Sequence, residues 1–174
     1  MNAIQHLLSG KIRLRLLMKF FLNPGNQEYL RGLAHEFDVS TNTVRQELNK
    51  LSDTGVLTSH EVLNKRFYQV NDRHALFEPI RRVLLRHTGL DSLYEMVISR
   101  LGALQTVYLT GSLAAGVDSP FIDLIMVGDI DRNYLNQLVP KAESFIGKKI
   151  RIAVYAPDEW DDAYIDGQQV MKLL

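Results

Sequence analysis

The sequence predicts an α+β fold, in which a helical unit with a hairpin is followed by a small α/β unit. From residue 10 to residue 53 apolar residues recur at helical spacing, and two β-rich runs follow. From residue 104 the pattern changes to strand, turn, strand, helix, strand. We therefore expect three parts: residues 1–73, a helical linker over residues 74–101, and a second domain over residues 102–174.

Residues 28–55 contain a pattern typical of two short helices joined by a tight turn. Residues 28–37 are amphipathic with helical spacing, and the sequence Asp38-Val39-Ser40 interrupts them. Ser40 is a suitable N-cap, because its hydroxyl can accept free backbone N–H groups of the next turn. The second helix is expected from Thr41 to about Asp53, with Gly55 ending it. Its apolar face is expected to consist of Val44, Leu48 and Leu51.

The polar side of this second helix predicts contact with double-stranded DNA. Its side chains can donate to and accept from base edges, and the start of a recognition helix is where they meet a major groove. The candidate DNA-binding residues of the helix are Ser40, Thr41, Asn42, Thr43, Arg45, Gln46 and Asn49. A polar helix surface that is only solvated stays open as the alternative.

The hairpin that follows predicts a wing. Residues 56–59 and 66–70 have the composition of strands, with residues 62–65 as the tip between them. Lys65 and Arg66 near this tip are candidates for contact with phosphates, which supply most of the sequence-independent affinity for DNA. Together these elements predict an N-terminal winged helix-turn-helix. The alternative is a basic tip that serves solubility alone.

Composition limits the class of protein. The 174 residues carry a net charge of zero, which argues against a protein that coats nucleic acid. Residues 1–75 have a net charge of +3 and the remainder −3, so a single copy is expected to bind DNA weakly and a homodimer is expected. The absence of cysteine fits a reducing cytoplasm. No membrane span is expected, and Met1–Ser9 lacks the features of a secretory signal.

The remaining elements follow from periodicity. A first helix is expected over residues 10–22, with Lys11, Arg13, Arg15 and Lys19 facing outward. Linker helices are expected over residues 74–87 and 91–101, and could serve as an intrachain brace or as a homodimer seam. In the second domain we expect strands over 104–109, 121–127 and 150–155, and a helix over 133–146 that Pro140 kinks or splits. A further helix is expected to start at residues 158–160.

The turn after the first strand of the second domain carries a motif. It reads GSLAAGVDSPFIDL over residues 111–124 and resembles the active-site signature of minimal nucleotidyltransferases of the DNA polymerase beta superfamily. In that family the Gly-Ser turn holds nucleotide phosphates, and carboxylates on two strands hold Mg²⁺ for phosphoryl transfer. The resemblance implies that Gly111 and Ser112 bind a nucleotide. An ordinary tight turn is the alternative.

The carboxylates of this signature are incomplete. Asp123 matches the second metal-binding carboxylate, but Phe121 stands in place of the first. The outward positions of the third strand are Arg151 and Ala153, and neither is acidic. We therefore predict no catalytic residues, no metal site beyond Asp123 as a residual ligand, and no cofactor other than a nucleotide held without metal.

The order of the two domains also resembles a known arrangement, a winged helix of the arsenic-repressor-like kind followed by a nucleotidyltransferase-like domain. This resemblance implies a DNA-binding transcriptional regulator whose second domain senses a nucleotide-like ligand or holds a protein partner. The alternatives are an active nucleotidyltransferase with a winged-helix targeting module, and a toxin-neutralising protein or scaffold.

Overall fold

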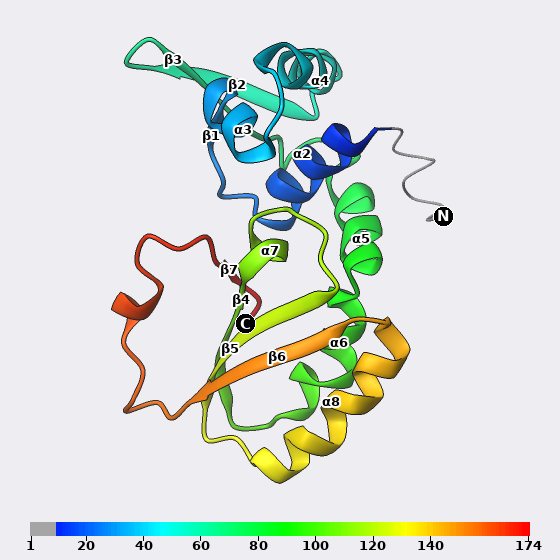
Figure 1. Cartoon of the computed structure of the whole chain (residues 1–174), viewed down its shortest axis with the longest axis vertical. Helices are drawn as coiled ribbons and strands as arrows, with labels where there is room; N and C mark the ends of the chain where they lie inside the picture. Colours follow the sequence, from blue (N-terminus) through cyan, green and yellow to red (C-terminus); the bar gives the residue numbers. More distant parts are fainter. Residues whose placement is uncertain (1–9) are drawn as a thin grey trace. The chain divides into compact units, whose positions relative to one another are not determined.

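A computed structural model describes residues 10–174, and the predicted lack of a secretory signal in residues 1–9 lies outside this range. The chain divides into two compact units, one ending at Leu84 and the other beginning at Leu85 (Figure 1). The fold is α+β, as predicted. Within residues 10–174 no helix has both the length and the apolar character that crossing a membrane requires.

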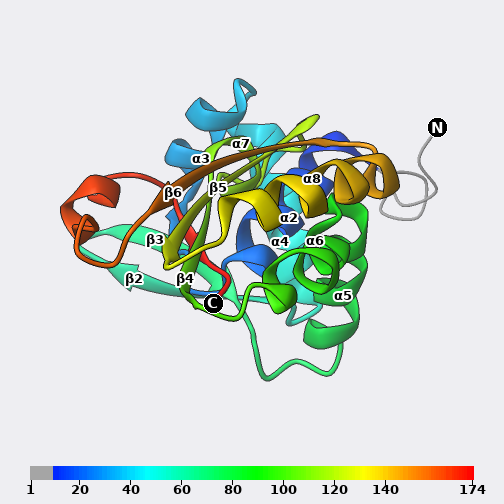
Figure 2. The same cartoon turned by 90° about the horizontal axis from the view of Figure 1, so that it is seen from below.

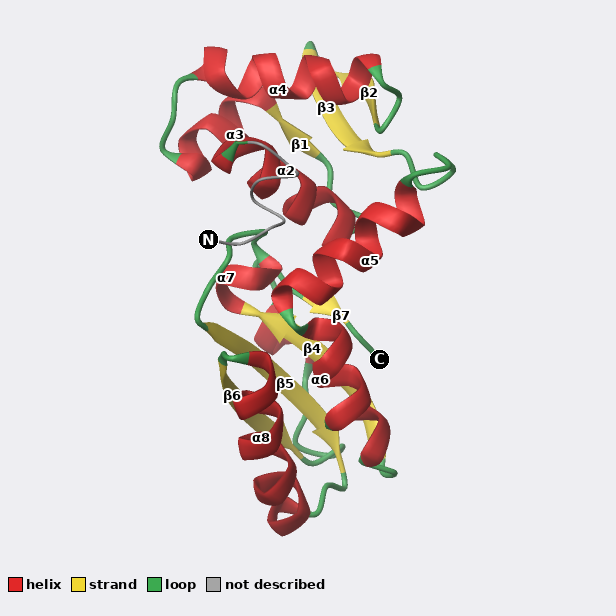
Figure 3. Ribbon diagram, turned by 90° about the vertical axis from the view of Figure 1, so that its right-hand side faces the viewer, coloured by secondary structure: helices red, strands yellow, loops and turns green. Residues whose placement is uncertain are grey.

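The N-terminal unit is a helical bundle with a small antiparallel sheet. Its strands lie in the order β1-β3-β2, and the sheet packs beside the helices (Figure 3). The core is apolar and includes Leu16, Phe20, Leu33 and Leu48, each fully buried. The elements are α2 (Lys11–Leu22), β1 (Glu28–Tyr29), α3 (Leu30–Phe37), α4 (Thr41–Asp53), β2 (Leu57–Val62), β3 (Lys65–Val70) and the first part of α5 (Phe77–Thr88).

Two predictions for this unit are wrong. Residues 28 and 29 were expected to begin the first helix of the pair, but they form β1 and pair with Tyr68 and Phe67 of β3. Lys19 was expected to face outward, yet its side chain is 0% exposed. Its ammonium lies 2.8 Å from a carboxylate oxygen of Glu36 and 3.2 Å from one of Glu28. Two carboxylates therefore compensate the buried charge.

The C-terminal unit is a four-stranded sheet in the order β6-β5-β4-β7, with α6 and α8 on the same side of it (Figure 2). Strands β5 and β6 are parallel and α8 connects them, whereas β4 is antiparallel to both of its neighbours. The elements are α6 (Leu90–Met96), a 3₁₀ turn (Ile98–Arg100), β4 (Leu104–Thr110), α7 (Gly111–Ala114), β5 (Phe121–Gly128), α8 (Arg132–Ile146), β6 (Lys149–Tyr155), a second 3₁₀ turn (Asp162–Ile165) and β7 (Met171–Lys172).

The order of strands and helix in this unit is as predicted, but three details differ. Helix α8 is one element through Pro140, so of the predicted kink or split the split does not occur. The linker helix expected over residues 91–101 is shorter, and its end is a 3₁₀ turn. Residues 158–160 do not begin a helix. Instead, Trp160 stacks on Tyr108 with ring centroids 5.6 Å apart, which holds this segment against the sheet.

Candidate nucleic-acid interface

The turn between α3 and α4 is fixed by a cap on each helix. Asp38 ends α3 in the left-handed conformation with φ of 54°, which an aspartate tolerates better than most residues. Ser40 then begins α4, and its hydroxyl accepts the backbone N–H of Thr43 at 3.2 Å, as predicted. The predicted bounds of α4, Thr41 to Asp53, agree with the structure. Two caps at successive helix ends hold the turn in one geometry.

Helix α4 buries one side and exposes the other. Val44 and Leu48 are completely buried, and Leu51 is nearly so. The opposite side is exposed at every position predicted to contact DNA, namely Ser40, Thr41, Asn42, Thr43, Arg45, Gln46 and Asn49. The polar side chains of α4 therefore lie together on an accessible surface, and their contact with DNA stays a prediction.

Glu47 joins this helix to α2. One of its carboxylate oxygens accepts a hydrogen bond from Nε of Arg13 at 2.7 Å, and the other from Nζ of Lys50 at 2.8 Å. Burial disfavours the charged carboxylate, but these hydrogen bonds outweigh burial and lower the pKa of Glu47 below its usual value of 4.5. The ionised form of Glu47 therefore stabilises the docking of α4.

Replacing Glu47 by glutamine is expected to make the free energy of unfolding of the N-terminal unit fall less as the pH is lowered. A folded-state pKa below the unfolded value means that Glu47 stabilises the unit above pH 4.5, and that this contribution disappears as the pH falls through the folded pKa. Denaturant unfolding followed by circular dichroism between about pH 7 and pH 3 measures this change. Glu61→Gln is the matched control, because the Glu61 side chain is 70% exposed. It should leave the pH dependence of the free energy of unfolding unchanged.

The wing is a regular antiparallel hairpin. Leu57 pairs with Val70 at its base and Val62 pairs with Lys65 at its tip, so the loop consists of two residues. Lys65 and Arg66 are both exposed, at the positions where phosphate contacts are predicted. The sequence analysis missed two partners of these residues. Nζ of Lys65 lies 5.1 Å from the ring centroid of Tyr29, and Arg66 lies 3.5 Å from the carboxylate of Glu61.

The Gly-Ser turn of the second unit lies beside Asp123. Thr110, at the end of β4, is the register partner of Asp123 on β5, and Gly111 follows directly with φ of +66°. A Cβ atom on Gly111 would lie 2.5 Å from a carboxylate oxygen of Asp123, so this position requires glycine. Ser112 is exposed at the start of α7. The Gly-Ser turn and the carboxylate of Asp123 are thus adjacent.

Arg151 occupies the position opposite this carboxylate. It is the register partner of Asp123 on β6, and its guanidinium donates two hydrogen bonds to the two carboxylate oxygens, one of them 2.8 Å long. These hydrogen bonds raise the pKa of Arg151 above its usual value. The guanidinium also lies 4.3 Å from the ring centroid of Phe121. The carboxylate is therefore paired with a cation of the same chain.

This arrangement does not fit a magnesium site. Mg²⁺ requires several oxygen ligands in octahedral geometry, and the positive charge of Arg151 beside Asp123 repels a divalent cation. In residues 10–174 no three His, Asp or Glu side chains are grouped so that they could bind a metal ion. No step of phosphoryl transfer can be derived from these residues.

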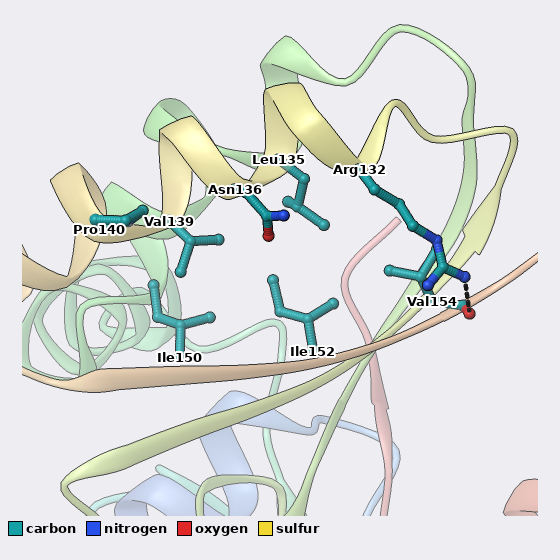
Figure 4. Close-up of a pocket in the computed structure, with 8 residues that line it drawn as sticks. All are labelled: Arg132, Leu135, Asn136, Val139, Pro140, Ile150, Ile152 and Val154. Carbon is teal, nitrogen blue, oxygen red and sulfur yellow. Dashed lines mark hydrogen bonds between the residues drawn. The ribbon is translucent and has the colours of Figure 1, made fainter.

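A cavity lies between α8 and β6. Its volume is about 330 Å³, and the side chains of Ile150 and Ile152 point from β6 toward α8 across it (Figure 4). Arg132, at one end of the cavity, donates to the backbone oxygen of Val154 at 3.4 Å. Arg132 and Asn136 are the polar side chains that line this cavity, and we assign no function to it.

Two helices joined by a capped turn and followed by a hairpin define a winged helix-turn-helix. Residues 28–61 match the DeoR-like helix-turn-helix domain family, and the N-terminal unit thus contains a DNA-binding domain of this class. None of the curated proteins matches the chain. The predicted winged helix-turn-helix is confirmed by the match and the geometry together.

Solved structures give partial matches. A predicted DNA-binding transcriptional regulator from E. coli is 20% identical, with 47% of this chain and 82% of that chain covered at a TM-score of 0.37. The antimony-specific transcriptional repressor AntR is 24% identical. The match covers 53% of this chain and 76% of AntR, with a TM-score of 0.38. A chain in a Shewanella oneidensis complex of a HEPN toxin with MNT antitoxin is 15% identical. The match covers 51% of this chain and 71% of that chain, with a TM-score of 0.36. Matches at these scores do not establish a shared overall fold.

Proposed function

We propose that this protein is a transcriptional regulator that binds double-stranded DNA as a homodimer. The observation that carries the proposal is the exposed polar surface of α4, held by two caps and followed by a basic wing. Helix α4 reads base edges in the major groove, with Arg45 and Gln46 as the longest side chains of its first turns. Lys65 and Arg66 on the wing contact flanking phosphates.

A homodimer follows from the size and charge of the binding surface. A single module of this kind buries only about 600–1,000 Å² on DNA. The net charge of the first 75 residues is only +3, so each copy gains little from non-specific attraction to phosphates. Two copies on half-sites about one helical turn apart supply the missing affinity.

The proposal is tested by selecting duplexes from a random pool with the full-length protein. Binding to the recovered duplexes is then measured by fluorescence anisotropy at several salt concentrations. We expect a recurring motif with two half-sites, and an affinity that falls steeply as salt rises. Recovery of no common sequence, together with an affinity that does not depend on salt, would contradict the proposal.

For the second unit we propose a nucleotidyltransferase-like domain that does not catalyse transfer and instead acts as a sensor or partner domain. The pairing of Asp123 with Arg151, and Phe121 in place of the other strand carboxylate, support this role. Gly111 and Ser112 are left to hold a phosphate group without metal. A shift in the melting temperature with nucleotide in EDTA would support nucleotide sensing.

The competing function is an active nucleotidyltransferase that uses the winged helix for targeting. It requires metal-dependent transfer of label from a nucleoside triphosphate, and Asp123→Ala should abolish that transfer. The guanidinium of Arg151 beside Asp123 argues against it, because a metal ion would have to displace this arginine. Label transfer that depends on both Mg²⁺ and Asp123 would overturn our assignment of the second unit.

A further inference from the structure

The tip of the wing combines a strained backbone with an exposed apolar side chain. Leu63 and Asn64 form the two-residue loop between β2 and β3, with φ of 48° and 63°. Positive φ at both positions is characteristic of a type I′ turn, for which Asn-Gly is strongly preferred. Asparagine fits this conformation, but leucine is rarely found there because its Cβ clashes with the backbone. Leu63 is thus the residue least suited to its backbone in this hairpin.

The side chain of Leu63 is 93% exposed, the highest value among the large apolar residues that the structure describes. Val62 beside it is 45% exposed. Single apolar residues on a surface are common and need no explanation. Here the exposed leucine also stands at a turn position where Gly or Asn would relieve the strain. Backbone strain of this kind points to a role outside the folding of the chain.

The surroundings of Leu63 indicate which partner it meets. The hairpin extends beyond the helices of the N-terminal unit (Figure 1), so its tip can reach a partner that the helices do not touch. The next two residues, Lys65 and Arg66, are cationic and exposed. An apolar tip with basic residues behind it has the chemistry of a minor-groove wedge, in which cations hold the phosphates and an apolar side chain enters between base steps.

We propose that Leu63 inserts into the minor groove of DNA beside the site read by α4, and that it partly unstacks a base step there. This proposal rests on the proposed DNA-binding function. The side chain of Leu63, exposed at the end of the hairpin, is small enough to enter a groove about 6 Å wide. Flexible pyrimidine–purine steps are the expected sites of insertion, since they unstack most easily. Leu63 thus adds sequence preference through DNA deformability rather than through hydrogen bonds.

The test compares the full-length protein with its Leu63→Asn variant on duplexes selected by the unaltered protein. Asparagine tolerates the left-handed conformation, so the variant is expected to melt at the same or a higher temperature. We expect about tenfold weaker binding without a change in the salt dependence, because no cation is removed. Bending of the DNA, measured by gel shifts of circularly permuted duplexes, should decrease. The unaltered protein should raise the fluorescence of 2-aminopurine placed at the step where Leu63 inserts, and the variant should not.

Three further variants separate the contributions. Leu63→Met keeps an apolar side chain and should retain the bend. Lys65→Ala should make the affinity for DNA less dependent on salt, by about one released counterion per protomer. It should not change the 2-aminopurine fluorescence. Leu76→Asn removes another leucine of the same unit, which is 51% exposed. It should change neither the affinity for the selected duplexes nor the bending of the DNA.

Two outcomes would overturn the proposal. If Leu63→Asn binds and bends the selected duplexes as the unaltered protein does, the wedge is wrong while the regulator function stands. If the variant changes only the oligomeric state in sedimentation, Leu63 contacts protein rather than DNA. A failure to select any duplex would instead count against the proposed function itself.

Discussion

Replacing Lys19 by alanine is expected to lower the free energy of unfolding of the N-terminal unit by about 3 kcal/mol. The ammonium group is completely buried and donates to both carboxylate oxygens of Glu36, at 2.9 and 2.8 Å. Its removal leaves Glu28 and Glu36 close together without their shared cation, and both carboxylates are mostly buried. Uncompensated charges in such a site cost far more than the loss of a surface ion pair.

Denaturant unfolding followed by circular dichroism measures this effect. Fluorescence of Trp160, the single tryptophan of the chain, reports separately on the second unit and should change less. Lys50→Ala is the matched control, because Lys50 is 58% exposed and pairs with Glu47 within the same helix; its loss should cost less than about 1 kcal/mol. Combining Lys19→Met with Glu28→Gln and Glu36→Gln should recover most of the lost stability, because no unpaired charge remains. An equal cost for the Lys19 and Lys50 variants would refute this account.

Lys19 also shows where sequence reasoning fails. Local periodicity correctly predicted a helix at this position, but it assigned the charged residue to the solvent side. The compensating carboxylates come from β1 and α3, and no pattern within α2 indicates that they meet Lys19. The same limit explains β1, because residues 28 and 29 leave the helical pattern to pair with a strand some 40 residues later in the chain.

Predictions that depend on nearby residues were more successful. The N-cap at Ser40, the bounds of α4 and the hairpin after it all follow from short-range signals, and the structure contains each of them. In the second unit the sequence shows Asp123 in the motif, and Phe121 and Arg151 at positions where the resemblance would place acidic residues. It could not show that Arg151 is bonded to Asp123, because that contact depends on the parallel register of β5 and β6.

Replacing Arg45 by alanine is expected to weaken binding to the selected duplexes by about 10- to 100-fold. Arg45 is exposed on the same side of α4 as Thr41, Asn42 and Asn49, and no other residue is shown bonded to its side chain in the part of the chain that the structure describes. An arginine at this point of a recognition helix can donate two hydrogen bonds to a guanine edge, and such a pair is worth about 1–3 kcal/mol. Its loss should relax the sequence preference at one position of each half-site.

Competition with duplexes that carry single substitutions distinguishes base contact from phosphate contact. If Arg45 reads a base, Arg45→Ala should bind the original duplex and the duplex altered at that position with equal affinity. Arg82→Ala, at an exposed arginine on α5 of the same unit, is the control and should leave affinity and preference unchanged. A uniform loss of affinity over all duplexes, accompanied by a smaller salt dependence, would mean that Arg45 contacts a phosphate. In that case Asn42 and Gln46 would have to supply the base readout, since both are exposed on α4 and an amide side chain can pair with adenine.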